Sequence, residues 1–239
     1  VAVETSRVST KTAISWRRGY RIIPKFLMGK PTDVFAIKMN FLPIFLRNLL
    51  AGFIAHINNG SNKIYGLPEP DHKFGATHPT INSELLYKIR HGKIKPRVEI
   101  ERFEGKKVYF KDKSIEKFDV IIACTGFVLA HPFFDKKFLN YSEGPVPLYL
   151  KMFHPTYDNL YFIGMFQPLG CIWPGAEQQS KLAALALKGS WKRPANIDVL
   201  CEREVTHPHM KQINTSRHRI TVDFHRFIRD LKTQINKIA

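Results

Sequence analysis

The chain has 239 residues, of which 44 % are hydrophobic, so it can bury a sizeable core and is not a disordered tail. Its formal net charge of +17 suits a nucleic acid, an anionic lipid or a polyanionic small molecule, but Lys and Arg are scattered without a long run. A solvated basic surface is therefore the preferred interpretation, and no nucleic-acid partner is expected. Three widely spaced cysteines exclude a disulfide scaffold and a redox-active thiol pair.

The first third of the chain mixes short strands with helix. Residues 1–7 have the character of the end of a helix, residues 12–16 of a short strand, and residues 35–57 of a helix. The stretch 41–57 is strongly apolar, but Arg47 interrupts it, and a helix that spans a membrane needs about 20 nearly uncharged residues. We expect this helix to pack on the protein, with an apolar face on a membrane surface as the alternative.

A loop and a capped helix follow. Residues 58–71 are rich in Gly, Asn and Pro, which is typical of a loop. Residues 83–91 are predicted to form a helix whose N-cap is Asn82 or Ser83 and whose end is marked by Gly92.

The middle of the chain has the pattern of β-structure. Residues 97–103 and 106–111 are predicted to form a hairpin with its turn at Glu104 and Gly105. Residues 118–123 are apolar apart from Asp119, which predicts a strand buried on both faces that leads into a turn of small residues.

The last part of the chain is predicted to alternate strand and helix. Residues 159–164 form an apolar strand, a turn follows, and a helix covers residues 176–187, ending at Gly189. A second, amphipathic helix is predicted near residues 224–235.

Small residues and prolines follow the last two strands in a distinctive order. Residues 124–127 are like an alanine-threonine-glycine-tyrosine linker, and residues 162–164 are a phenylalanine-isoleucine-glycine strand. A glutamine-proline-x-glycine turn follows at 167–170, then Pro174, and then a glutamate-x-glutamine pair formed by Glu177 and Gln179. This order resembles the C-terminal half of the flavin-containing monooxygenase family. The resemblance extends to segments 16–19, 29–33, 66–72, 78–83 and 216–223.

The resemblance implies an α/β fold, the FAD/NAD(P)-binding Rossmann-like (three-layer ββα) fold of two-dinucleotide-binding flavoproteins, present in part. It makes residues 1–127 the remainder of an NADPH-binding domain with a helical insert at about 34–92. Residues 128–190 would be the C-terminal part of an FAD-binding domain, and residues 191–239 a tail with an amphipathic helix. This sequence has no G-x-G-x-x-G turn for either pyrophosphate, so we expect a fragment of a longer enzyme.

The function that the resemblance implies is an NADPH- and FAD-dependent monooxygenase. Such an enzyme transfers one oxygen atom from O2, through a flavin hydroperoxide, to a soft nitrogen or sulfur nucleophile. The alternatives are a Baeyer-Villiger ketone monooxygenase, or an inactive fragment or basic binding protein. The expected location is intracellular and cytoplasmic, and both a homo-oligomer and a peripheral membrane contact through residues 41–57 stay open.

Arg17 and Arg18 are the candidate readers of the NADP 2′-phosphate. They follow the strand at 12–16, where NAD-selective folds keep an acidic residue, and no Asp or Glu occurs between Thr5 and Pro31. A solvated basic loop is the structural alternative.

The remaining candidates lie on the FAD side. Glycines there let the backbone approach a flat ring, and the start of the helix after them could stabilise negative charge on it. Gln167 is the candidate to touch the isoalloxazine, whereas Glu177 is expected to be an ordinary surface charge and Gln179 a surface residue. No certain catalytic side chain and no metal site are expected. The candidates for contact with FAD are Thr125, Gly126, Gly164, Gln167, Pro168 and Gly170.

Overall fold

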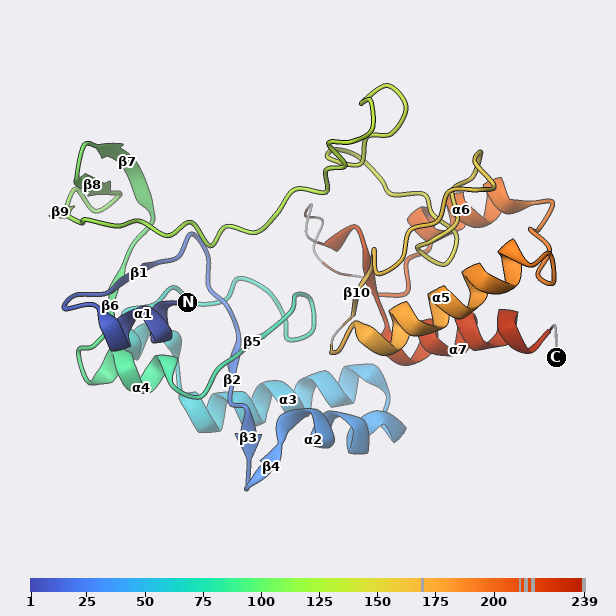
Figure 1. Ribbon diagram of the computed structural model, residues 1–239. Helices are drawn as coiled ribbons and strands as arrows, with labels where there is room; N and C mark the ends of the chain where they lie inside the picture. Colours follow the sequence, from blue (N-terminus) through green and yellow to red (C-terminus); the bar gives the residue numbers. More distant parts are fainter. Residues whose placement is uncertain (169, 211, 213–214, 216–217, 238–239) are drawn as a thin grey trace. The chain divides into compact units, whose positions relative to one another are not determined.

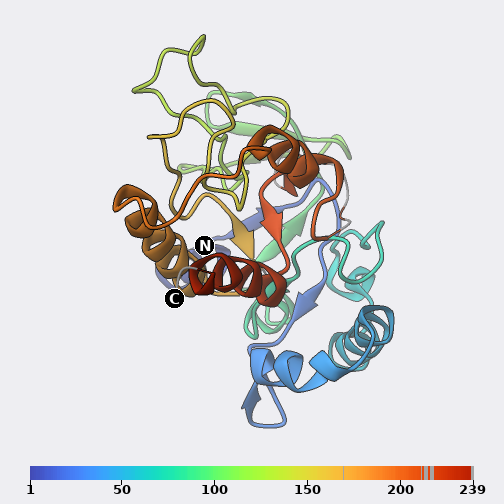
Figure 2. The same ribbon diagram turned by 90° about the vertical axis from the view of Figure 1, so that its right-hand side faces the viewer.

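The chain divides into two compact units, Val1–Thr125 and Gly126–Ala239 (Figures 1 and 2). The division lies beside the boundary expected near Phe127; the assignment of the two parts to an NADPH and an FAD domain stays a prediction. Leu169, Ser216 and Arg217, which belong to the motifs above, lie outside the described residues. The structure is a computed structural model that describes residues 1–168, 170–210, 212, 215 and 218–237.

The first unit combines helices with small sheets, which confirms the α/β class. Its helices are α1 (Ala2–Val8), α2 (Thr32–Lys38), the 3-10 turn η1 (Met39–Phe41), α3 (Ile44–Asn59), the 3-10 turn η2 (Asn62–Tyr65) and α4 (Leu85–Arg90). Its strands are β1 (Ala13–Ser15), β2 (Ile22–Ile23), β3 (Phe26–Leu27), β4 (Lys30–Pro31), β5 (Thr80–Ile81), β6 (Lys95–Arg97), β7 (Ile100–Glu104), β8 (Lys107–Phe110) and β9 (Ile115–Lys117).

Pairing among these strands is local. β1 pairs with β6, and β2 with β5, in parallel, while β3–β4 and β7–β8–β9 are antiparallel. The predicted strand at 12–16 is confirmed as β1, and the predicted hairpin as β7–β8 with Gly105 at φ +54° in its turn. Within the described residues each sheet has two or three strands, so the three-layer arrangement stays a prediction.

The predicted continuous helix at 35–57 is wrong, because Pro43 divides it. A proline disfavours helical backbone at the residue before it, and Leu42 is extended with ψ +146°. α2 therefore ends at Lys38, and α3 starts at Ile44.

The capped helix is confirmed as α4. The Oδ1 atom of Asn82 accepts hydrogen bonds from the backbone N–H groups of Glu84 at 2.8 Å and Leu85 at 2.7 Å. Gly92 ends the segment in the left-handed conformation at φ +69°. The buried face of α4 contributes to the core of this unit, which consists of Val3, Ile22, Leu67, Leu85, Leu86, Ile89 and Ile94.

An ion pair connects the β1–β6 sheet with β9. Arg97 and Lys11 both pair with the largely buried carboxylate of Glu116, Lys11 at 2.6 Å. Two cations on one carboxylate hold the end of β6 against the three-stranded sheet.

The buried strand predicted at 118–123 is wrong. These residues take no strand conformation, and Val120, Ile121 and Ile122 are exposed. A strand needs hydrogen-bonding neighbours on its edges, and among the described residues no strand pairs with this segment.

The regular secondary structure of the second unit is mainly helix. It contains α5 (Trp173–Leu187), α6 (Ile197–Thr206), α7 (Phe224–Asn236), β10 (Gln167–Pro168) and β11 (Thr221–Val222). α5 begins three residues before its predicted start, and α6 was not predicted. The strand predicted at 159–164 is wrong, since only the isolated bridge between Phe153 and Tyr161 forms there.

α7 confirms the predicted amphipathic helix. The carboxylate of Asp223 caps it by accepting from the N–H of Arg226 at 2.8 Å. Phe227 and Leu231, four residues apart, are fully buried, and Ile235 continues the same face. α7 packs against α5 through this face.

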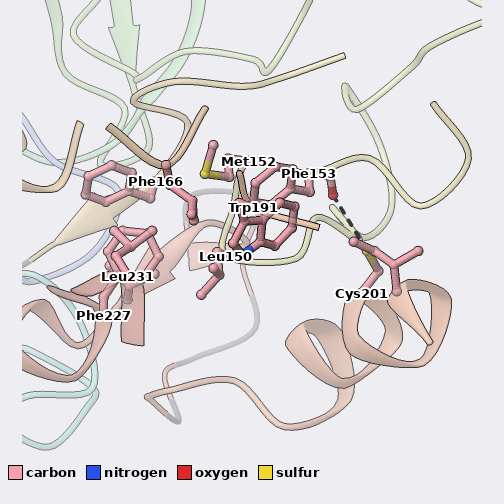
Figure 3. Packing of buried hydrophobic residues seen from close by; sticks show 11 residues of the cluster. Leu150, Met152, Phe153, Phe166, Trp191, Cys201, Phe227 and Leu231 are labelled. Carbon is pink, nitrogen blue, oxygen red and sulfur yellow. Dashed lines mark hydrogen bonds between the residues drawn. The ribbon is translucent and has the colours of Figure 1, made fainter. Parts of the chain in front are cut away.

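A buried cluster joins α5, α6 and α7 with the loop around Phe153 (Figure 3). Phe153 and Trp191 stack with their ring centroids 4.5 Å apart, and the ring centroids of Phe166 and Phe227 are 4.6 Å apart. The expected tail, residues 191–239, thus shares its core with the preceding segment. The cluster comprises Leu150, Met152, Phe153, Phe166, Leu182, Trp191, Ile197, Cys201, Val222, Phe227 and Leu231.

Candidate cofactor site

A buried glutamine fixes the loop that carries the candidate flavin-side residues. Gln179 on α5 is fully buried; its Oε1 accepts from the N–H of Gly164 at 2.8 Å, and its Nε2 donates to the carbonyl of Leu150 at 3.0 Å. Gly164 has φ +78°, a conformation that costs other residues about 1 kcal/mol or more. One side chain therefore connects the helix with two loops.

The loop held at Leu150 is itself a tight turn. Leu150 and Lys151 have φ +52° and +54°, both in the left-handed region. The ammonium group of Lys151 pairs with the carboxylate of Glu204 on α6 at 3.1 Å, and both side chains are buried. The surroundings thus stabilise a backbone conformation that is unusual without glycine.

Gln167 and Pro168 come shortly after Gly164 and form strand β10. The N–H of Gln167 donates to the carbonyl of Ile220 at 2.8 Å, next to the parallel pairing with β11. The Gln167 side chain is half-buried, and its amide has no hydrogen-bond partner among the described residues. Its backbone is fixed while its side chain keeps its donor and acceptor for a ligand.

Helix α5 starts at Trp173, five residues after Pro168. Gly170 has φ +139°, and a Cβ placed on it would meet nothing within 4 Å, so the space beside it is open. The N-cap residue Ile172 provides no side-chain hydrogen bond to the first turn. The partial positive charge of the N-terminus is thus not offset by a capping side chain.

Close packing fixes where α5 begins. A Cβ on Gly175 would lie 2.3 Å from Cζ of Phe166, so only glycine lets the first turn pack on this ring. Glu177 pairs with Lys181 at 2.6 Å on the surface, and the hydrogen bond from this lysine lowers the pKa of the glutamate. Glu177 is the surface charge that was expected, whereas the expectation of a surface position for Gln179 is wrong.

The two candidate arginines, Arg17 and Arg18, differ in their pairing. Arg17 is exposed, two residues after β1, and has no ion pair among the described residues. Arg18 contacts the carboxylate of Asp71 at 3.3 Å. The hydrogen bond from His72, with the charge of Arg18 as a smaller contribution, lowers the pKa of Asp71. Arg17 therefore keeps its guanidinium available for an anion.

Thr125 and Gly126 lie in an exposed, irregular segment. Gly126 has φ +95°, and a Cβ there would meet nothing within 4 Å. The chain bends at Thr125, after the predicted strand. Contact of these two residues with a nucleotide stays a prediction.

The geometry at the start of α5 and at Arg17 suits anionic groups. The first offers a helix start without a side-chain cap, although Pro174 lacks an N–H and the N–H of Gly175 already donates to Ile172. The second offers an unpaired cation after a parallel strand. Within the described residues, no group of three or more His, Cys, Asp or Glu is placed to hold a metal ion.

The sequence model described as Flavin-binding monooxygenase-like matches residues 1–238. The chain belongs to this family. It is 30 % identical to "Flavin-containing monooxygenase 5" of Rattus norvegicus over 235 residues, which cover 94 % of this chain and 44 % of the relative. It is 29 % identical to "Dimethylaniline monooxygenase [N-oxide-forming] 2" of Oryctolagus cuniculus over 214 residues, with coverages of 84 % and 39 %.

These comparisons confirm the resemblance inferred from the sequence. The chain spans less than half the length of the curated relatives it matches. The family name supports flavin as a cofactor. Gln179 is the residue of this site whose role sequence reasoning missed, although its spacing from Gly175 and Leu182 placed all three on one helix face.

Proposed function

We propose that the chain is the C-terminal part of an NADPH- and FAD-dependent monooxygenase that transfers one oxygen atom from O2 to a soft nitrogen or sulfur nucleophile. The other oxygen atom leaves as water, and NADPH supplies the two electrons. The observation that carries the proposal is the family match over residues 1–238. The clamp of Gln179 on Gly164 and Leu150 supports it, because it fixes the loop three residues before Gln167. A relative named for N-oxide formation favours nitrogen oxidation over Baeyer-Villiger oxidation.

The bound flavin would supply the oxygen-activating chemistry, as cofactors do in redox enzymes. Gln167, Pro168 and Gly170 would hold one edge of the ring, and the α5 N-terminus would stabilise negative charge near it. Arg17 would pair with the 2′-phosphate of NADPH, which NADH lacks. Arg18, already paired with Asp71, would contribute less.

The two pyrophosphate-binding turns would come from residues outside this sequence, so we infer that the chain alone does not retain FAD. We also propose a reducing, intracellular and cytoplasmic location, because Cys124, Cys171 and Cys201 are all free thiols.

The substitution Arg17→Ala tests the coenzyme assignment in the enzyme completed with both turns. A charge-assisted contact contributes about 1.5–3 kcal/mol, so KM for NADPH should rise roughly 10- to 100-fold while KM for NADH changes little. Arg18→Ala is the matched control and should have the smaller effect. Equal losses with the two coenzymes would remove Arg17 from this role. Absence of flavin from the completed, folded protein would overturn the proposed function itself.

A further inference from the structure

A pocket of about 450 Å³ opens in the first unit, where the end of α3 meets η2 and the end of α4. No helix in the described part of the chain, α3 included, has both the length and the hydrophobicity that crossing a bilayer requires. The lining residues of the pocket lie between residues 57 and 65 and between residues 86 and 91, and none of them is a candidate for contact with FAD or NADPH. A volume of this size is typical of the sites at which proteins bind small molecules.

Aromatic and aliphatic side chains line much of the pocket. The rings of Tyr87 and His91 lie 4.0 Å apart, and Ile57 and Leu86 add aliphatic surface. The Nδ1 atom of His91 lies 2.9 Å from the carbonyl of Tyr87. A carbonyl only accepts, so this nitrogen carries the proton and the hydrogen bond fixes the imidazole ring. These surfaces suit the flat, apolar body of an aromatic ligand.

Arg90 supplies a positive charge at the pocket. Its Cζ atom lies 5.1 Å from the centre of the Tyr65 ring, and the hydroxyl of Tyr65 donates to the carbonyl of Asn59 at 2.8 Å. The fixed ring therefore holds the guanidinium group in place. Arg90 has no ion pair among the described residues, and no Asp or Glu lines the pocket. The guanidinium group thus keeps its N–H groups for the carboxylate of a ligand, which it can bind in a bidentate way.

The helix ends at the pocket act against an anion, but weakly. α3 ends at Asn59 and α4 at Arg90, so each places partial negative charge from its last carbonyls near the pocket. Solvent and salt screen this effect at an exposed helix end. A carboxylate on a guanidinium group forms charge-assisted hydrogen bonds, which are the stronger interaction. The balance therefore favours an anionic ligand.

We propose that this pocket binds a small aromatic carboxylate. The carboxylate would accept hydrogen bonds from Arg90, and the aromatic ring would pack against Tyr87, Ile57 and Leu86. Such a ligand needs no soft nitrogen or sulfur atom, so it is distinct from the substrate of the proposed oxygen transfer. This inference does not depend on the proposed redox activity.

Saturation-transfer NMR of ligands with the full chain tests the charge requirement. Phenylacetate should bind, whereas benzylamine and benzyl alcohol, which carry the same ring with a positive charge or none, should bind at least about tenfold more weakly. Arg90→Gln should weaken phenylacetate binding at least about tenfold, or about 1.4 kcal/mol. Lys88→Gln removes the same charge from the same helix without changing a lining residue. It is the matched control and should bind phenylacetate like the parent chain.

Glycine amide signals locate the bound ligand. Gly60 lines the pocket, whereas Gly105 lies in the β7–β8 turn outside it. In a chain isotope-labelled at its glycine nitrogens, phenylacetate should shift the signal of Gly60 and leave that of Gly105 in place. An unchanged Gly105 signal in the Arg90→Gln variant shows that the variant is folded.

Three results would overturn the proposal. The first is an absence of phenylacetate binding to the parent chain. The second is equal binding of phenylacetate by the parent and Arg90→Gln, or binding of benzylamine or benzyl alcohol as tight as that of phenylacetate. The third is binding that shifts other glycine signals but not that of Gly60, because it would place the ligand elsewhere on the chain.

Discussion

Replacing Gln179 by leucine tests the clamp between α5 and its two loops. Leucine is similar in volume but leaves the N–H of Gly164 and the carbonyl of Leu150 without their partner. Two hydrogen bonds at about 1 kcal/mol each, and about 1 kcal/mol for the desolvated carbonyl, give a loss of about 3 kcal/mol in the free energy of unfolding of this unit. The loss should appear as a lower urea midpoint with an unchanged m-value.

Trp191 provides the signal, because it is buried and stacked on Phe153 in the same core. Urea unfolding is followed by fluorescence in a chain with Trp16→Phe and Trp173→Phe, so that only this ring emits. Gln167→Leu is the matched control; its side chain has no hydrogen-bond partner in the described part of the chain, and the change should stay within about 0.5 kcal/mol. A loss below about 1 kcal/mol for Gln179→Leu, or equal losses for both glutamines, would refute the clamp.

Two further measurements address ionisable groups. Burial raises the pKa of the Cys201 thiol to about 11, so iodoacetamide at pH near 8 should label the exposed Cys124 and Cys171 but label Cys201 only after denaturation. Burial alone would raise the pKa of Glu116, but hydrogen bonds from its cationic neighbours, including Arg97, outweigh it and lower that pKa. The ionised Glu116 carboxylate therefore stabilises the folded protein at pH values above its pKa in the unfolded chain, about 4.3. This stabilisation is lost as the pH falls through the pKa of the same group in the folded protein. The substitution Glu116→Gln should lower the free energy of unfolding by about 1 kcal/mol near pH 7 and by little near pH 3. Urea unfolding that shows the same loss at both pH values would contradict this.

Local signals in the sequence predicted the elements whose stabilisation is local. The cap at Asn82, the turn at Gly105 and the amphipathic spacing of α7 all act within a few residues, and all three are confirmed. The strands at 118–123 and 159–164 failed for the opposite reason. Apolar character predicts burial, but a strand forms only where another strand supplies hydrogen bonds, and a single segment cannot show that.

The candidate site divides in a similar way. Family motifs drew attention to Gly164 and Gln167, and the structure gives both a defined backbone position. The role of Gln179 depends on Leu150, 29 residues earlier in the chain, and such long-range contacts do not follow from spacing alone. The pairing of Arg18 with Asp71 across 53 residues escaped the sequence for the same reason.

The core shared by α5 and α7 makes the second unit intolerant of shortening. A premature stop codon after residue 190 would remove Phe227 and Leu231, and the rings of Phe153 and Phe166 would lose the side chains that keep water from them. Such a product would stay partly unfolded and become a substrate for cellular proteases. Truncated transcripts of this gene should therefore yield little stable protein, even though every residue of the glutamine-proline-x-glycine turn would still be translated.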